Sequence, residues 1–418
     1  MAADVLYVTF DGALQPLAFS QAVRVVAGLG HRGLRYHLLS TERSADLANA
    51  ERSRAVEELL RPAGVGWTHV TADSMGTARR AADALVRMIA QAVRVIRRER
   101  IRLVHARGYH GALLARALKE MTGLPYIFDA RGYWIEERSG PGHWFSTSTS
   151  YAVGKFIEQT LFRAADAVVT LTDLQATDLL SGLFGPPPRM IEVIPTCTDY
   201  DAFYLRKSRP AKPDVGGAVP QTVRSRLEGK LVVSIVGALN DSYYVKEALT
   251  LAKLAVERAP SAHILVLSLQ QREYGAALQS LGVPSERYTL ASAEHWAMPD
   301  WLQWIDWGLL LLPETAAKRA SMPTKLAEFF ATGVRPVFFG CNSEATRWVE
   351  RAGSGYVLPS ITPEQLLEAS SVVTASTIDH ARLLRARGIT EPHFSLASCL
   401  DRYVRFVGAC LSSGARPG

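Results

Sequence analysis

Cysteine is scarce in this chain of 418 residues, and no apolar run is long enough to span a membrane. The four cysteines are scattered without the spacing of a metal site, so we expect reduced thiols. They are Cys197, Cys341, Cys399 and Cys410. The N-terminal segment enters a strand-like stretch without a basic region or a cleavage site, so no secretory signal is expected. These absences predict a soluble protein of the cytoplasm.

A strong charge of either sign is also missing. The formal net charge is +7, which is mild for this length and fits an anionic ligand. A nucleic-acid partner is not expected, because no basic stripe with interleaved aromatic residues is present. The densest basic run, Arg94 to Arg102, follows apolar residues at helical spacing. It predicts the solvated side of an amphipathic helix, with binding to a membrane surface as the alternative.

Strand-like and helix-like segments alternate along the chain, which predicts an α/β fold with doubly wound parallel sheets. A first domain is expected at 1–195 and a second at 231–390, joined by a linker at 196–230 that is rich in Pro, Lys, Arg and Gly. Residues 391–418 are expected to form a C-terminal helix that packs back on the first domain. Ligands of open α/β sheets bind at the carboxyl ends of the strands, so a cleft between the two domains is the expected site.

Two short motifs have simpler interpretations than their letters suggest. Gly28-Leu-Gly-His-Arg-Gly33 has the glycine spacing of a dinucleotide fingerprint, but it follows a helix and precedes a strand. We interpret it as the turn that ends a helix. Asp199-Tyr-Asp201 has the form of a metal-binding motif, and a capping turn before Phe203 is the preferred interpretation.

The most informative segment is Ser321–Val337, which predicts a polar loop, a short helix, a glycine stop at Gly333 and a strand. Either Ser321 or Thr324 is expected to cap the helix, and Pro323 is expected in its first turn.

Lys325 and Glu328 lie three residues apart in this segment and therefore on one side of the helix. A helix N-terminus with a lysine suits a phosphate, and a carboxylate one turn further along can accept hydrogen bonds from a ribose. The segment thus predicts a site for a nucleoside diphosphate, and an ordinary solvated helix is the alternative.

Two stretches resemble the GT-B glycosyltransferases, in particular the retaining family 4. Val193–Phe203 is similar to the family pattern IPNGVD…F, and Pro323–Val337 is similar to its donor signature P-x-K-x-x-E-x-x-A-x-G-x-P-V. The resemblance extends over essentially the whole chain. It implies a GT-B fold, in which two Rossmann-like domains face a central cleft.

The resemblance also implies a donor site. Glu328 would bind the donor ribose, and Lys325 would lie against the diphosphate and act in catalysis. Gly237 would face the diphosphate, followed by a basic residue, for which Lys246 is the candidate. The implied donor-binding residues are Gly12, Gly237, Lys246, Ser321, Met322, Pro323, Thr324, Lys325 and Glu328.

On the acceptor side, Asp129 and Arg131 are the further catalytic candidates, with Asp129 orienting either Arg131 or the acceptor. The other residues expected on this side are Gln15, His105, Arg107, Trp134 and Glu137. Two alternatives remain open at this point. The Asp129–Arg131 pair could brace a loop with Trp134 in the core, and His105 could be a core histidine.

Two positions depart from the family pattern. Ala320 stands where a glutamate is usual, so its contact to the transferred sugar would come from Lys318 or Arg319, or be absent. Ala238 replaces the arginine expected after Gly237, and Tyr243 or Tyr244 would then supply hydrogen bonds to the diphosphate.

The expected function is a hexosyl transfer from a UDP- or GDP-linked sugar to a small-molecule or saccharide acceptor, with retention and without a metal or cofactor. Bacterial antibiotic or polysaccharide biosynthesis is the expected setting, with at most peripheral membrane contact and a possible homodimer. The alternatives are a catalytically inactive nucleotide-binding subunit and a GT-B sugar-nucleotide epimerase.

Overall fold

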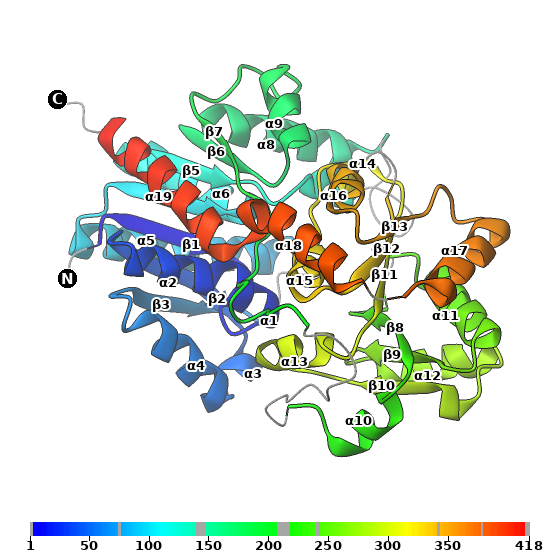
Figure 1. Cartoon of the computed structure of the whole chain (residues 1–418). Coiled ribbons are helices and arrows are strands. Elements are labelled where there is room, and N and C mark those ends of the chain that lie inside the picture. The colour runs from blue at the N-terminus through cyan, green and yellow to red at the C-terminus, as the bar shows by residue number, and fades with distance from the viewer. Residues whose placement is uncertain are drawn as a thin grey trace. The chain divides into compact units, whose positions relative to one another are not determined.

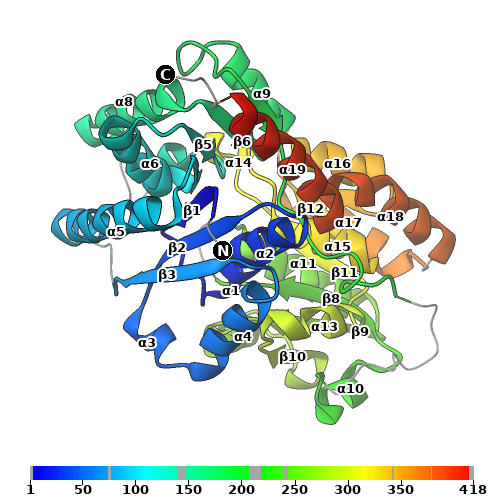
Figure 2. The same ribbon diagram turned by 90° about the vertical axis from the view of Figure 1, so that its left-hand side faces the viewer.

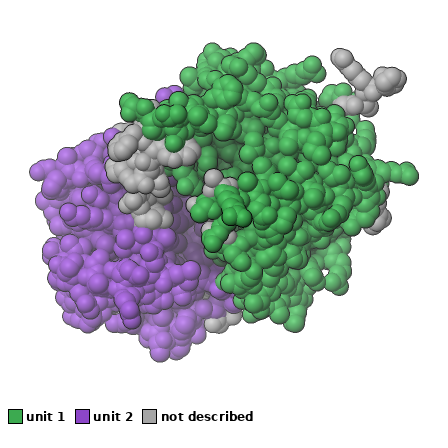
Figure 3. All heavy atoms as spheres, turned by 180° about the vertical axis from the view of Figure 1, so that it is seen from behind, with its two compact units in different colours: residues 1–196, 396–418 green, residues 197–395 purple. Residues whose placement is uncertain are grey.

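The computed structural model describes residues 3–73, 77–138, 147–206, 218–239, 243–340, 343–377 and 379–413. The chain divides into two compact units, coloured separately in Figure 3. Unit 1 comprises Met1–Thr196 together with Leu396–Gly418, and unit 2 comprises Cys197–Ser395. The described part of the stretch expected as a linker, beyond Thr196, therefore belongs to unit 2.

Unit 1 is built on a seven-stranded parallel sheet with the order β3-β2-β1-β4-β5-β6-β7 (Figure 1). Its strands are β1 (Val5–Thr9), β2 (Tyr36–Glu42), β3 (Gly66–Thr71), β4 (Leu103–Arg107), β5 (Tyr126–Asp129), β6 (Ala167–Thr170) and β7 (Ile191–Val193). Figure 2 shows β2 and β3 side by side at one edge. All residues of β1, β4 and β5 are buried, because helices cover both faces of a parallel sheet.

The helices of unit 1 connect successive strands, and one returns from the end of the chain. They are α1 (Pro16–Ala18), a π-helix (Phe19–Val23), α2 (Arg24–His31), α3 (Ser44–Leu47), α4 (Ala50–Leu60), α5 (Ala78–Glu99), α6 (Gly108–Thr122), α7 (Trp134–Glu137), α8 (Thr149–Ala164), α9 (Asp173–Leu180) and α19 (Leu396–Ser413). Arg94, Arg97 and Arg98 of the basic run lie on the exposed side of α5, whereas Val95 and Ile96 are buried, and Arg100 and Arg102 follow the helix. The predicted amphipathic helix is thus confirmed.

The glycine-rich motif at Gly28–Gly33 ends α2, as the sequence predicts. Gly28 packs against Leu400 of α19, and Gly30 packs against the backbone oxygen of Ala63, where a Cβ would clash in both cases. Gly33 has φ +87°, a left-handed conformation that favours glycine. The glycines therefore serve helix packing and a turn.

Unit 2 has a six-stranded parallel sheet with the order β10-β9-β8-β11-β12-β13. Its strands are β8 (Leu231–Val236), β9 (Ala262–Leu267), β10 (Tyr288–Ala291), β11 (Trp307–Leu311), β12 (Arg335–Phe339) and β13 (Tyr356–Val357). The helices are α10 (Gln221–Leu227), α11 (Val245–Arg258), α12 (Gln271–Ser280), two 3₁₀ helices (Ser285–Arg287 and His295–Ala297), α13 (Met298–Leu302), α14 (Ala316–Arg319), α15 (Thr324–Thr332), α16 (Glu344–Ala352), α17 (Pro363–Ala375) and α18 (His380–Phe394). A core of aliphatic and aromatic side chains joins this sheet to α11 and α17.

Both sheets are doubly wound, which confirms the predicted fold class. In unit 1 the chain passes from β1 outward through β2 and β3, and then from β4 in the other direction. In unit 2 it passes from β8 through β9 and β10, and then from β11. The order of strands therefore reverses between β1 and β4 and between β8 and β11, and the carboxyl ends of these strands are where such sheets bind ligands.

The Asp199-Tyr-Asp201 motif forms a turn in unit 2. The side chain of Asp199 accepts hydrogen bonds from the backbone amides of Asp201, at 3.1 Å, and Ala202, at 3.2 Å. The predicted capping turn before Phe203 is confirmed.

Three of the four cysteines, Cys197, Cys399 and Cys410, are buried thiols. The fourth, Cys341, lies outside the described residues. Among the residues that are described, no helix is both long and apolar enough to cross a bilayer.

Candidate functional site

Helix α15 carries the two residues that the sequence singles out most clearly. The helix begins at Thr324, with Pro323 at the N-cap position and no side-chain cap among the described residues. The expected cap from Ser321 or Thr324 is therefore wrong, because the Ser321 hydroxyl donates instead to the backbone oxygen of Lys318, at 3.1 Å. The predicted stop is confirmed, since Gly333 ends α15 with φ +78°.

Lys325 lies directly against Gly237. Gly237 follows β8 with φ +122°, and a Cβ at this position would clash with Lys325 Nζ. The ammonium group also lies 4.4 Å from the centre of the Tyr243 ring, within range of a cation–π attraction. A lysine from the start of α15 is thus held at the carboxyl end of β8, at the switch point of the unit 2 sheet.

Glu328 is 6% exposed, and its side chain does not face Gly237 as that of Lys325 does. Its Oε1 lies 3.6 Å from Nε2 of His295, in the 3₁₀ helix His295–Ala297. Phe203 packs edge-on against the His295 ring, with centroids 6.1 Å apart. His295 was not foreseen from the sequence, because only the fold brings residues 295 and 328 together.

The other donor candidates of unit 2 lie in the loop before α15, at the first residue of α15, or on α11. Met322 is buried, and Ser321, Pro323 and Thr324 are partly exposed in the loop before α15 and at its first residue. Lys246 is exposed on α11, and no side-chain hydrogen bond or ion pair is found for it within the described ranges. Its role stays a prediction, while Lys325 is the cation that packs on Gly237.

The departures from the family pattern have distinct surroundings. Ala320 is fully buried at the end of α14. The ring of Tyr243 faces Lys325, whereas Tyr244 packs near Phe339, with ring centroids 6.0 Å apart. Of the two tyrosines, Tyr243 is therefore the one at the switch point.

In unit 1, the loop after β1 is held by a buried carboxylate that the sequence interpretation missed. Glu42, at the end of β2, accepts hydrogen bonds from the amides of Ala13 at 2.7 Å and Leu14 at 3.2 Å, and from the Ser40 hydroxyl at 2.5 Å. Burial raises the pKa of Glu42 although these hydrogen bonds act in the opposite direction.

Gly12 is the residue of this loop that lets Glu42 approach. A Cβ at Gly12 would lie 3.0 Å from Glu42 Oε2 and 3.3 Å from Gln15 Nε2. The absence of a side chain at Gly12 thus makes room for the carboxylate of Glu42. Contacts of Gly12 and Gln15 to substrates stay predictions.

Asp129 is the centre of a buried cluster at the carboxyl end of β5. Its Oδ1 accepts a hydrogen bond from Arg131 at 3.3 Å, and its Oδ2 accepts one from the Tyr403 hydroxyl of α19 at 3.2 Å. Oδ2 also lies 4.0 Å from Arg107 and 3.9 Å from His105. The structure therefore brings together Asp129, Arg131, Arg107 and His105, as the sequence suggested, and adds Tyr403.

Burial and the neighbouring charges together determine the protonation states of Asp129 and His105. Burial alone would raise the pKa of Asp129, but Arg131 and Arg107 outweigh it and the pKa is lowered. Burial lowers the pKa of His105 to about 4, so this ring is neutral near pH 7. Its Nδ1 lies 3.1 Å from the Tyr36 hydroxyl, which supports the interpretation of His105 as a core histidine.

Arg107 links the cluster to the loop after β1. Its Nε donates to Asp11 Oδ2 at 3.3 Å, so side chains from the ends of β1 and β4 meet at the switch point of the unit 1 sheet. Burial would lower the pKa of Arg107, but Tyr7, Asp11 and Asp129 together raise it. The guanidinium group therefore stays charged.

Trp134 belongs to a neighbouring aromatic group. Its ring stacks on Tyr109 at 5.9 Å and meets His110 edge-on at 5.1 Å, both from α6. Glu137 lies at the exposed end of α7. Among the acceptor-side candidates, His105 and Arg107 thus lie around Asp129, Trp134 belongs to a second group, and Gln15 lies beside Gly12.

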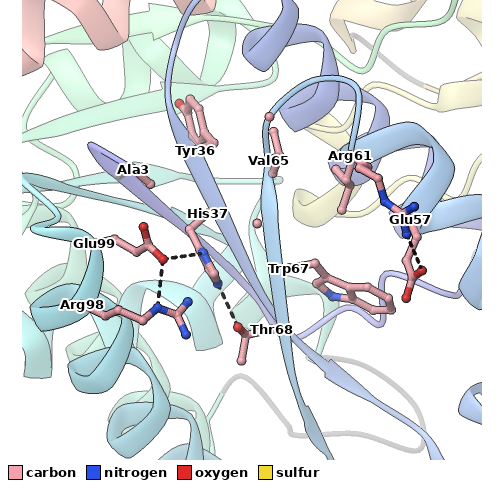
Figure 4. A pocket seen from close by; sticks show the side chains of 13 residues that line it. Ala3, Tyr36, His37, Glu57, Arg61, Val65, Trp67, Thr68, Arg98 and Glu99 are labelled. Atoms are coloured by element: carbon pink, nitrogen blue, oxygen red, sulfur yellow. Dashed lines mark hydrogen bonds and ion pairs between the residues drawn. The ribbon is translucent and has the colours of Figure 1, made fainter. Parts of the chain in front are cut away.

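A cavity of 490 Å³ lies at the opposite, amino end of the unit 1 strands (Figure 4). His37 is at its centre, with Nε2 at 2.9 Å from the Thr68 hydroxyl and Nδ1 at 4.0 Å from Glu99. Glu99 in turn accepts from Arg98 at 2.9 Å. These polar groups satisfy one another, and none of the predicted site residues lines the cavity.

The described part of the chain contains no group of three or more His, Cys, Asp or Glu residues that could hold a metal ion.

Comparison with known proteins gives the same fold for the whole chain. A sucrose-phosphate synthase from Thermosynechococcus elongatus superimposes with a TM-score of 0.75 and 10% identity, covering 98% of this chain and 100% of that one. Anabaena HepE, solved in complex with UDP and glucose, gives a TM-score of 0.67 and 13% identity, with 97% and 99% covered. A putative UDP-N-acetylglucosamine 2-epimerase from Listeria monocytogenes gives 0.63 and 10%, with 100% and 99% covered. No curated protein matches the sequence.

The family model for the glycosyl transferase 4-like domain matches residues 20–197. This part of the chain is therefore similar to that family. Its match ends at the boundary of unit 1, and it includes β4, β5 and the Asp129 cluster except Tyr403. Together with the structural matches over nearly the full length, it gives the chain the GT-B fold that the sequence predicts.

Proposed function

We propose that this GT-B protein is a glycosyltransferase that moves a hexosyl group from a nucleotide-diphosphate sugar to a small-molecule or saccharide acceptor. The observation that carries the proposal is the position of Lys325. Its ammonium group lies beside Gly237 at the switch point of the unit 2 sheet, at the first turn of a nine-residue helix without a side-chain cap in the described structure. Free amides and a lysine at this point suit a diphosphate.

The reaction breaks the anomeric C–O bond to the diphosphate and forms a bond from the anomeric carbon to the acceptor oxygen. The acceptor hydroxyl gives its proton to the leaving diphosphate. Negative charge develops on the leaving diphosphate as the bond breaks. Lys325 and the amides of Thr324 and Lys325 would stabilise this charge without reorganising, which is how preorganised donors lower a barrier. This step needs no metal, and we propose that none takes part.

Glu328 is the proposed ligand of the donor ribose. A carboxylate accepts strong hydrogen bonds from the two ribose hydroxyls, and its burial strengthens them. His295, 3.6 Å away, would keep the carboxylate oriented. Ser321, Met322, Pro323 and Thr324 would line the diphosphate and sugar, with Lys246 and Gly12 as further donor contacts.

In unit 1, Arg131 is the proposed catalytic cation and Asp129 holds it in place. The Asp129 cluster keeps two guanidinium groups, those of Arg131 and Arg107, at the carboxyl ends of β5 and β4. Gln15, His105, Trp134 and Glu137 complete the proposed acceptor side, His105 through its packing in the cluster.

The comparisons support particular choices within this proposal. UDP is the first nucleotide to test because HepE is solved with UDP and glucose, and GDP is the second. We propose retention of configuration because the sequence resembles family 4. We propose a cytoplasmic enzyme of bacterial antibiotic or polysaccharide biosynthesis, with peripheral membrane contact at most and a possible homodimer.

A second candidate is an inactive nucleotide-binding subunit. It is favoured by Ala320, which is buried and offers no polar side chain where the family pattern has a glutamate. Lys318 or Arg319 would have to contact the transferred sugar in an active enzyme.

The test is the release of nucleoside diphosphate from a panel of UDP- and GDP-linked sugars, with and without candidate acceptors. An active transferase releases the diphosphate faster when the right acceptor is present. Nucleotide binding without release from any donor would favour the inactive subunit, and conversion of a donor to its epimer would favour an epimerase.

A further inference from the structure

Unit 1 contains an apolar cavity of 420 Å³ between α6, α7 and α8. Its volume falls in the range of small-molecule binding sites, which are about 300–1,000 Å³ and mostly apolar. The residues that line it are Tyr109, His110, Leu113, Trp134, Ile135, Thr149, Ser150, Val153, Gly154, Ile157 and Leu161.

The cavity lies at the ligand-binding edge of the sheet. Helix α6 begins directly after β4, and α7 begins five residues after the end of β5, so both start at the carboxyl ends of their strands. The His110 ring joins the cavity to the loop after β1, because it lies 5.7 Å from Phe10 and 5.1 Å from Trp134. The cavity therefore adjoins the proposed acceptor residues of unit 1.

The lining selects against charged ligands. No Asp, Glu, Lys or Arg is among the described residues that line it. Burial lowers the pKa of His110, so its imidazole is neutral near pH 7. Bringing an ion here would cost desolvation that no charged residue of the described lining offsets, whereas an uncharged apolar group gains free energy from burial.

Hydrogen bonds hold the aromatic side chain of Tyr109, which lines the cavity. The Tyr109 hydroxyl donates to Glu158 at 2.6 Å, and Glu158 is bound by Lys155. Lys155 also donates to Glu136 at 3.1 Å, in the first turn of α7. This network, which is buried at Tyr109 and Glu158, orients the Tyr109 ring without any ligand, so the cavity is formed in advance.

The mouth of the cavity exposes aliphatic side chains. Val153 is 52% exposed and Ile157 is 40% exposed, one turn apart on α8. Phe156, on the same helix, is 69% exposed but does not line the cavity. A ligand in the cavity would shield Val153 and Ile157 from water, whereas Phe156 would stay exposed.

We propose that this cavity binds an uncharged apolar group of the acceptor, an aromatic ring or a short alkyl chain, against Trp134 and Tyr109. Its role in acceptor binding rests on the proposed glycosyltransferase function, whereas binding of an apolar group does not. The acceptor is accordingly amphiphilic, with an apolar part in the cavity and a hydroxyl that receives the sugar.

The binding test uses the neutral fluorescent probe N-phenyl-1-naphthylamine with the full chain. We expect saturable binding to one site, weakened at least tenfold by Val153→Asp and by Trp134→Ala, and unchanged by Phe156→Asp. The last variant places the same charge on the same helix outside the cavity. Octyl glucoside should displace the probe and glucose should not.

Two outcomes would overturn the inference. One is the absence of saturable binding in folded protein; the other is an equal effect of Val153→Asp and Phe156→Asp, which would assign the probe to the general surface of α8. Flotation with phosphatidylcholine vesicles distinguishes binding of a membrane from binding of a ligand in the cavity. If the protein binds vesicles, and Phe156→Asp abolishes this binding while Val153→Asp does not, the exposed side of α8 is a membrane-contacting surface and the inference about the cavity is wrong. Donor binding, measured as UDP affinity, should stay unchanged in Val153→Asp, so failure here is distinguishable from failure of the proposed function.

Discussion

At the scale of the residue, the two charged side chains of α15 have separate tasks. Lys325 turns to Gly237 and Tyr243, while Glu328 turns inward to His295. Their spacing of three places them on one side of a helix, but their partners come from different elements. Substitutions of the two residues should therefore affect different steps.

Glu328→Ala should weaken nucleoside diphosphate binding by about 10- to 100-fold, because hydrogen bonds to a charged group contribute about 1.5–3 kcal/mol. Titration calorimetry with UDP and GDP measures the effect. Glu328→Gln keeps the shape and one acceptor oxygen, so its loss should be smaller. Unchanged affinity in a folded Glu328→Ala variant would remove this residue from the donor site.

Lys325→Ala should lower kcat by at least 100-fold with little change in the free energy of unfolding, because the ammonium group stabilises charge that develops in the transition state. The matched control is Lys253→Ala on α11, whose lysine forms an exposed ion pair with Glu257 at 3.5 Å. Steady-state kinetics with the preferred donor check both variants. Equal kcat values for the two would contradict the proposed role.

At the scale of the element, the close contacts of α2 depend on glycine. Gly30 faces the backbone oxygen of Ala63, which cannot move as a side chain can. Gly408, in α19 of the same unit, provides a matched helical glycine, because a Cβ there would meet only open space within 4 Å among the described residues.

Gly30→Ala should destabilise unit 1 by about 1–3 kcal/mol, the usual cost of overpacking. Gly408→Ala should be neutral or stabilising by up to about 1 kcal/mol, because alanine favours a helix more than glycine does. Urea unfolding followed by tryptophan fluorescence compares them. A Gly30→Ala protein as stable as the Gly408→Ala protein would mean that α2 can shift away from Ala63.

Element positions and types were largely predictable from the sequence, and the partners of the site residues were not. The alternation of strand-like and helix-like segments predicted the doubly wound parallel sheets, and Gly333 predicted the end of α15. Tyr403 and His295 carry no local pattern that links them to Asp129 and Glu328, because each pair is far apart in sequence. The expected cap by Ser321 was wrong since a nearby carbonyl, that of Lys318, competes for its hydroxyl.

At the scale of the whole molecule, buried histidines make stability depend on pH. Burial lowers the pKa of His37, His105 and His263 to about 4, whereas an exposed histidine titrates at about 6.5. The depressed pKa of His263 reflects burial first and then the nearby cations Arg226, Lys230 and Arg287. In the folded protein these rings stay neutral while the unfolded chain takes up protons. Their stabilising contribution is thus complete above about pH 6.5 and is lost as the pH falls toward 4.

The free energy of unfolding should therefore fall between about pH 6.5 and 4, with each histidine contributing up to about 1.4 kcal/mol per pH unit. The raised pKa values of Glu42 and Glu158 oppose this loss, whereas the lowered pKa of Asp129 adds to it only below about pH 4.

His263→Gln should flatten this acid dependence, because glutamine does not titrate and can still reach the Thr289 hydroxyl that lies 2.9 Å from His263 Nε2. Urea titrations at several pH values from neutral down to about 4.5 measure the slope across the range where histidine titrates. A slope identical to that of the unsubstituted protein would show that His263 does not couple to unfolding.

The return of α19 to unit 1 has a consequence for how the protein is made. On the ribosome, residues 1–196 emerge first, and the whole of unit 2 is synthesised before residues 396–413 appear. Until then Asp129 has no Tyr403 hydroxyl to bind, and Gly28 has no Leu400 to pack against. The first unit to be translated is therefore the last to be completed, and a chain that stops short of α19 leaves the Asp129 cluster open to water.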